Sequence, residues 1–145
     1  MEDRMRLEID SLPSNEAFAR VVVAAFATRL NPTMEEVSDL KTAVSEAVTN
    51  AIIHGYQNAI HTIAIEAAIT ENVITVSVQD FGVGIEDIKK AMEPLYTTRK
   101  DLERSGMGFV FMEAFMDQLV VESEPGLGTK VTMTKRIGRR YDAQD

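Results

Sequence analysis

The hydrophobic pattern at the start of the chain changes from strand-like to helical spacing. Residues 5–10, MRLEID, alternate apolar and polar positions and predict a first strand that ends before Pro13. The following stretch, NEAFARVVVAAFATRL, predicts a helix over residues 15–30, with Ser14 as its N-cap. Asn31 and Pro32 then end this helix, because proline cannot continue the hydrogen-bond pattern.

A second helix of about 20 residues is predicted from Thr33 onward. Thr33 and Glu36 have the spacing of a capping box, in which each side chain bonds the other residue's backbone N–H. Gly55 follows the last position with helical spacing and predicts the helix end.

The pattern in the second half of the chain predicts four strands and two further helices. Residues 61–69 and 72–80 are rich in β-branched residues and are separated by a hairpin-like turn, so they predict adjacent antiparallel strands. After residue 85 we expect a short helix and then an irregular, mobile segment through Met107 that acts as a lid. Helical spacing returns at 108–119, and strands are predicted at 118–124 and 128–137. This order predicts an α/β sandwich with helices on one face of a mixed, largely antiparallel sheet.

Composition and charge limit the classes of protein. The 145 residues, 45% hydrophobic and 26% charged, suit one globular domain, which we expect at 1–137, followed by a polar tail at 138–145. No signal peptide or membrane-length apolar run is visible, so a cytoplasmic protein with no membrane contact is expected. The absence of cysteine excludes thiolate chemistry, and a net charge of −8 disfavours direct nucleic-acid binding. A protein partner or a small ligand, including a nucleotide, is expected instead.

A polar stripe marks the second predicted helix. Glu46, Asn50 and His54 recur every fourth residue and therefore share one face of the helix. An amide oxygen at Asn50 suits Mg²⁺ shared with nucleotide phosphates, and Glu46, about 6 Å along the axis, could accept a proton from an attacking hydroxyl or water. The alternative is a polar seam at a solvent edge, and His54 is interpreted as a capping or supporting residue.

Two glycine-rich segments suggest nucleotide contacts. In DFGVGI, Gly82 and Gly84 let the backbone approach a ligand, and Asp80 could accept a hydrogen bond from an exocyclic amine such as that of adenine. In RSGMGF, amides near Gly106 and Gly108 precede a helix and could hold phosphate, with Arg104 nearby. Taken singly, the first segment could be a strand-to-helix turn and the second a flexible hinge.

The ordered set of these motifs resembles the Bergerat-fold ATPase superfamily, which includes gyrase B and the histidine kinases. The segments TAVSEAVTNAIIHGY, PLYTTRKDLERSGMGF and MEAFMDQLVVESEPGLGT are similar to the anti-sigma F factors of endospore-forming bacteria, which are small serine protein kinases. The resemblance implies ATP or ADP with Mg²⁺, a homodimer, inhibition of a sporulation sigma factor (sigma F), and phosphorylation of a serine on an anti-anti-sigma factor. Residue patterns alone indicate only an α/β domain that binds a magnesium nucleotide. A non-catalytic binding module and a histidine-kinase fragment are the alternatives.

The resemblance also assigns roles to particular residues. It implies that Glu46 and Arg104 are catalytic, that Asn50 binds the magnesium ion, and that Arg20 contacts protein partners. The residues implied to bind the nucleotide are Asn50, Asp80, Gly82, Gly84, Thr98, Gly106, Met107, Gly108 and Thr129.

Overall fold

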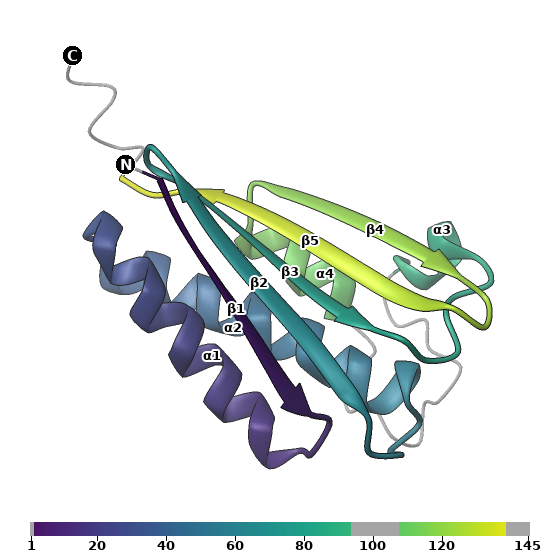
Figure 1. Ribbon diagram of the computed structural model, residues 1–145. Helices are drawn as coiled ribbons and strands as arrows, with labels where there is room; N and C mark the ends of the chain where they lie inside the picture. Colours follow the sequence, from purple (N-terminus) through teal and green to yellow (C-terminus); the bar gives the residue numbers. More distant parts are fainter. Residues whose placement is uncertain (1, 94–107, 139–145) are drawn as a thin grey trace.

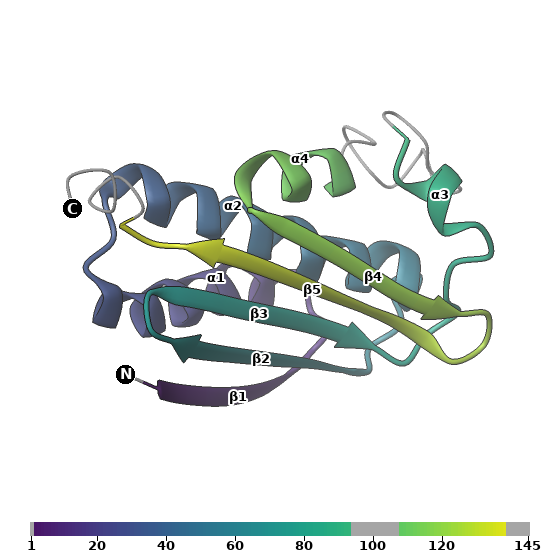
Figure 2. The same cartoon turned by 90° about the horizontal axis from the view of Figure 1, so that it is seen from above.

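The computed structural model describes residues 2–93 and 108–138. Helices cover one face of a five-stranded sheet (Figures 1 and 2), which confirms the predicted two-layer sandwich. The strand order is β1-β2-β3-β5-β4. All neighbouring strands in the described residues are antiparallel, whereas the sequence predicts a mixed, largely antiparallel sheet. The strands are β1 (Glu2–Asp10), β2 (Thr62–Thr70), β3 (Val73–Asp80), β4 (Gln118–Glu124) and β5 (Gly128–Arg136).

Helix α1 (Ser14–Ala27) continues into a short 3-10 turn, η1 (Thr28–Leu30), as the apolar pattern predicts. The predicted Ser14 cap is wrong, because Pro13 occupies the N-cap position and Ser14 already belongs to the helix. Proline pre-sets the helical φ angle and has no N–H to satisfy, which explains why the helix begins one residue earlier than expected.

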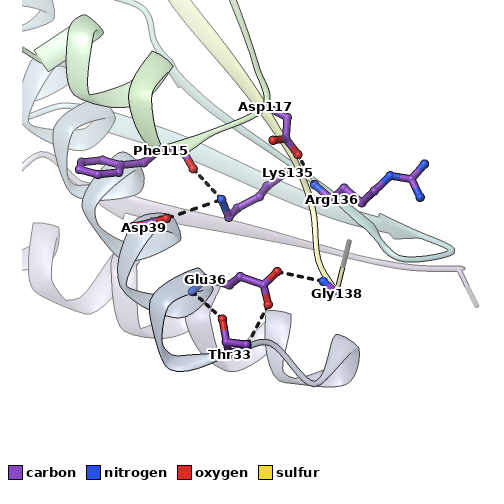
Figure 3. A network of polar contacts seen from close by, with 8 residues as sticks. All are labelled: Thr33, Glu36, Asp39, Phe115, Asp117, Lys135, Arg136 and Gly138. Carbon is purple, nitrogen blue, oxygen red and sulfur yellow. Dashed lines mark hydrogen bonds and ion pairs between the residues drawn. The ribbon is translucent and has the colours of Figure 1, made fainter. Parts of the chain in front are cut away.

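Helix α2 (Met34–Asn50) lies between α1 and α4 (Gly108–Phe115) across the sheet (Figure 2). Its predicted capping box is present: the Thr33 hydroxyl accepts from the Glu36 N–H, and the Glu36 carboxylate accepts from the Thr33 N–H. Glu36 also accepts a hydrogen bond from the Gly138 N–H at 2.9 Å, which ties the start of α2 to the end of β5 (Figure 3).

The core forms where the apolar faces of α1, α2 and α4 meet the inner face of the sheet. Alternate residues of β2 and β3 point to this face, as the period of a strand requires. Short helix α3 (Ile88–Ala91) stands apart, near the end of β4 (Figure 1). The largest fully buried side chains include Leu40, Ile63, Ile65, Ile69, Ile74, Met112 and Met133.

Three polar contacts connect the end of β5 to α2, to α4 and to the residues after α4. Lys135 on β5 donates to the Phe115 carbonyl at 2.8 Å and lies 3.8 Å from the Asp39 carboxylate on α2 (Figure 3). Asp117 accepts a 2.7 Å hydrogen bond from the Arg136 N–H. These contacts position α4, whose first residue, Gly108, borders the candidate site.

Candidate nucleotide-binding site

A cavity of about 540 Å³ opens where the C-terminal end of α2, the end of β3 and the start of α4 come together. Its size is within the range usual for small-molecule sites. Five of the residues predicted from the sequence line it, although they come from segments far apart in the chain. These residues are Asn50, Asp80, Gly84, Gly108 and Thr129.

The other predicted site residues are placed differently. Glu46 is half-buried on α2, one turn before Asn50, and is not among the described residues that line the cavity. Gly82 lines a second pocket together with Tyr56 and Phe81, and it is not among the described residues that line the first. Thr98, Arg104, Gly106 and Met107, together with the predicted lid, lie outside the described residues.

A π-helical turn forms the wall of the cavity that carries Asn50 and His54. Helix α2 changes at its end into η2 (Ala51–Gly55), where the wider i→i+5 pattern replaces the usual helical bonds. Asn50 precedes this turn and His54 lies within it, and both line the cavity. The predicted helix end at Gly55 is confirmed. The change of helix type could not be predicted from the polar stripe.

Asp80 is the buried charge of the site. It is only 4% exposed at the end of β3, and burial raises the pKa of its carboxyl group to about 6. Hydrogen bonds from the backbone of Gly82, at 2.9 Å, and of Thr129 oppose this rise. The carboxylate is thus held in one orientation while it stays accessible from the cavity.

Gly55 packs against the Asp80 carboxylate, a role that the sequence did not reveal. A Cβ atom built on Gly55 would lie 2.5 Å from Cγ and Oδ2 of Asp80, so any side chain at this position would force the carboxylate to move. Gly82 approaches the Gly55 carbonyl even more closely, at 1.9 Å for the same construction. The sequence pattern predicts only a helix end at Gly55, whereas the structure shows that this glycine also makes room for the Asp80 carboxylate.

The loop after β3 is held by backbone contacts on both sides. The Val83 N–H donates to the Gly55 carbonyl at 2.9 Å, and the Gly126 N–H donates to the Val83 carbonyl at 2.7 Å. Gly84 has a φ of 78° and packs against the Glu124 carbonyl. The glycines of DFGVGI are therefore required by close backbone packing, and Gly84 lines the cavity as well.

Tyr56 connects three segments around the site, although no sequence motif marks it. Its hydroxyl donates to the Thr62 carbonyl and accepts a 2.8 Å hydrogen bond from the Phe81 N–H. It thereby joins the end of η2 to the start of β2 and to the residue after Asp80. Burial raises the pKa of its phenol, so the hydroxyl keeps its proton.

Arg20 lies on α1, away from this cavity. Its side chain is 42% exposed and is 3.6 Å from Glu16, one turn earlier. The Nε atom is buried and has no hydrogen-bond partner among the described residues. Phe18 and Val21 on the same helix are 51% and 54% exposed.

Comparisons with known proteins agree with this fold. A sequence model described as "Histidine kinase-like ATPase domain" matches residues 9–135. The crystal structure of the RsbU and RsbW domains of a Mycobacterium tuberculosis protein superimposes on 93% of this chain with a TM-score of 0.63. The two sequences are 18% identical and the match covers 32% of that chain, so this likeness shows the fold alone.

Curated relatives are much closer in sequence. The chain is 63% identical over 134 residues to an anti-sigma F factor of Thermoanaerobacter sp., covering 92% of this chain and 94% of the relative. It is 58% identical over 137 residues to that of Clostridium acetobutylicum, covering 94% and 96%. The chain therefore belongs to the histidine kinase-like ATPase family and, within it, to the anti-sigma F factors.

No helix in the described ranges is long and apolar enough to cross a bilayer.

Proposed function

We propose that this protein is an ATP-dependent serine kinase of the cytoplasm that also binds and inhibits the sporulation sigma factor sigma F. Its kinase substrate would be a serine of an anti-anti-sigma factor. One observation carries the proposal: a buried carboxylate, Asp80, and the amide of Asn50 border one nucleotide-sized cavity. They do so in a chain whose relatives, 55–63% identical, are named anti-sigma F factors.

The cavity suits an adenine nucleotide. Asp80 at its base can accept a hydrogen bond from the adenine amine, and Gly108 places the first N–H groups of α4 beside the cavity, where phosphate is stabilised. Thr129 lines the same cavity from β5. These donors and acceptors support ATP and ADP as the ligands.

Asn50 is the proposed protein ligand of Mg²⁺. In the described ranges no group of three or more His, Cys, Asp or Glu side chains could hold a metal. Mg²⁺ commonly uses few protein ligands and takes phosphate oxygens and water for the rest, so one amide oxygen facing the phosphates fits its chemistry. When bound, the ion would neutralise charge on the transferred phosphoryl group.

Glu46 is the proposed general base. It precedes Asn50 by one helical turn, about 6 Å along the axis, and lies beyond the described lining of the cavity. A serine hydroxyl presented by a protein substrate would have to reach the phosphates from outside the nucleotide pocket. A carboxylate just beyond that pocket is well placed to take the hydroxyl proton.

Helix α1 is the proposed contact surface for protein partners. Phe18 and Val21 are three positions apart and expose apolar surface on neighbouring positions of the helix. The Arg20 side chain beside them is 42% exposed, so its guanidinium group can donate hydrogen bonds to an acceptor on a partner. We propose that this exposed side of α1 contacts protein partners, which are a second copy of the chain, sigma F and the anti-anti-sigma factor.

A phosphotransfer assay tests the proposal. The protein is mixed with MgCl₂, γ-labelled ATP and a purified anti-anti-sigma factor, and the labelled residue is identified by mass spectrometry. We expect phosphoserine on the partner with wild-type protein, and no label with Asn50→Ala. Asn72→Ala is the matched control, because Asn72 lies in the β2–β3 turn, outside the described cavity lining.

Two outcomes would change the assignment. Tight ADP binding without phosphoserine would favour a non-catalytic module in which nucleotide only sets the shape of the sigma-binding surface. Absence of ADP binding would reject the site itself.

A further inference from the structure

Ser123 makes three hydrogen-bond contacts at the edge of the cavity. It lies on β4 directly opposite Thr129 of β5. Its Oγ atom is 2.8 Å from the Ile85 nitrogen, 3.0 Å from the Gly128 carbonyl oxygen and 2.8 Å from the Thr129 hydroxyl oxygen. No role for this serine follows from the sequence motifs.

The chemistry of the partners fixes the direction of each bond. The Ile85 N–H can only donate, and the Gly128 carbonyl can only accept. Either hydroxyl could donate in the contact between Ser123 and Thr129. All three contacts can be hydrogen bonds at the same time only when the single proton of the Ser123 hydroxyl goes to Gly128 and the Thr129 hydroxyl donates to Ser123. With one bond donated and two accepted, the Ser123 hydroxyl is fully used.

This arrangement decides what Thr129 offers to a ligand. Because its proton is directed to Ser123, the Thr129 oxygen can only accept a hydrogen bond from the cavity side. Asp80, its register partner on β3, is also an acceptor when ionised. Asp80 and Thr129 then present two hydrogen-bond acceptors to the cavity. They favour a ligand edge that carries N–H donors and disfavour one that carries a carbonyl oxygen.

Ser123 also holds the loop after β3. The bond from Ile85 fastens the end of residues 81–85 to β4, beside the point where Gly84 packs against the Glu124 carbonyl. Loss of the serine hydroxyl would release this loop and free the Thr129 proton at the same time.

We propose that Ser123 is a positioning residue that sets the base selectivity of the cavity by making Thr129 an acceptor. This inference rests on the proposed nucleotide binding. Ser123→Ala should lower the affinity for ADP, whose base carries a 6-amino group. The affinity for IDP, whose base carries a 6-oxo group, should rise, because the freed Thr129 proton can donate to that oxygen.

Calorimetric titration of the full chain with ADP and with IDP measures this effect. We expect the ratio of the two affinities to fall about tenfold in Ser123→Ala, as the loss of one hydrogen bond predicts. Ser123→Thr keeps the hydroxyl and should restore the ratio. Ser77→Ala is the matched control, since Ser77 lies on β3 with its side chain on the opposite face from Asp80, and it should leave the ratio unchanged.

A double variant separates selectivity from simple loosening of the fold. In a Thr129→Val background, Ser123→Ala should have no further effect on the ratio of ADP to IDP affinity. Residue 129 then has no hydroxyl proton whose direction Ser123 could control. A purely structural role would instead lower the affinities for ADP and IDP in parallel in either background.

A measurement without ligand completes the test. Hydrogen exchange of the Ile85 amide should be faster in Ser123→Ala than in wild type, and unchanged in Ser77→Ala. Normal ADP binding with an unchanged ADP-to-IDP ratio in Ser123→Ala would overturn the role of Ser123 alone. Failure of the wild type to bind either nucleotide would reject the proposed function, and with it the selectivity.

Discussion

The backbone of Gly55 lies so close to the Asp80 carboxylate that a Cβ atom at position 55 would be 2.5 Å from Cγ and Oδ2 of the acid. Gly82, in the loop after Asp80, packs in turn on the Gly55 carbonyl. The end of η2, the Asp80 carboxylate and the loop of Gly82 are therefore packed directly against one another. A larger side chain at Gly55 or Gly82 would displace its neighbours.

Gly55→Ala should displace the Asp80 carboxylate and abolish tight nucleotide binding. Gly55 does not have a positive φ angle, so the cost is steric and we expect about 1–3 kcal/mol of lost stability from overpacking. Calorimetric ADP titration and thermal unfolding measure the two effects. Gly126→Ala is the control: its φ of 82° makes the change strained, but no atom lies within 4 Å of the added Cβ. It should lower stability by about 1–2 kcal/mol and leave the ADP affinity unchanged.

Nucleotide affinity should fall as the pH is lowered through about 6, where the Asp80 carboxyl group gains its proton. The protonated acid can no longer serve as a pure acceptor for the adenine amine, so affinity should drop up to tenfold per pH unit below the pKa. ADP titrations between pH 5 and 8 measure this. An Asp80→Asn variant should bind weakly and lack this inflection, and an equal inflection in that variant would contradict the assignment.

The stability of the ligand-free protein should change in the opposite direction. The folded-state pKa of Asp80 is raised above its ordinary value of 3.8, so the folded state binds this proton more tightly than the unfolded state does. The contribution of Asp80 to the free energy of unfolding therefore becomes more favourable as the pH falls from about 6 to 4, by roughly 3 kcal/mol at most. Urea unfolding of wild type and Asp80→Asn across this range isolates the contribution, because other carboxyl groups titrate equally in both.

Glu46→Gln should abolish phosphate transfer and spare nucleotide binding. Because Glu46 is not among the described residues lining the cavity, we expect the ADP affinity to change less than twofold. Loss of a general base should reduce the single-turnover rate by about 10²–10⁴-fold. Glu35→Gln, an exposed change on the same helix, is the control. Transfer at the wild-type rate in Glu46→Gln would reject Glu46 as the base.

Glu36→Ala should destabilise the fold more than a helix cap alone would. Its carboxylate accepts from both the Thr33 and Gly138 N–H groups, so the change removes two hydrogen bonds at once (Figure 3). We expect a loss of about 1–3 kcal/mol in urea unfolding. Glu35→Ala, which removes an exposed neighbour from the same helical turn, should cost less than 1 kcal/mol.

The sequence by itself determined the element order, the antiparallel hairpins and the start of α2, because these depend on local patterns. Alternating apolar residues in β2 and the capping pair Thr33 and Glu36 act within a few positions of one another. The motif residues Asn50, Asp80, Gly84, Gly108 and Thr129 were also found from the sequence, since their residue types carry chemistry and match a known family.

Only the tertiary structure decided how these residues meet. The contact of Gly55 with Asp80, the bond from Phe81 to Tyr56 and the bond from Ile85 to Ser123 join residues 25 to 38 positions apart, and no local pattern encodes such contacts. The close packing of Gly82 on the Gly55 carbonyl is likewise a contact between distant segments, and Gly82 is not among the described residues that line the main cavity. The sequence gives the type of each side chain. The burial that raises the pKa of Asp80 arises only when distant segments pack together.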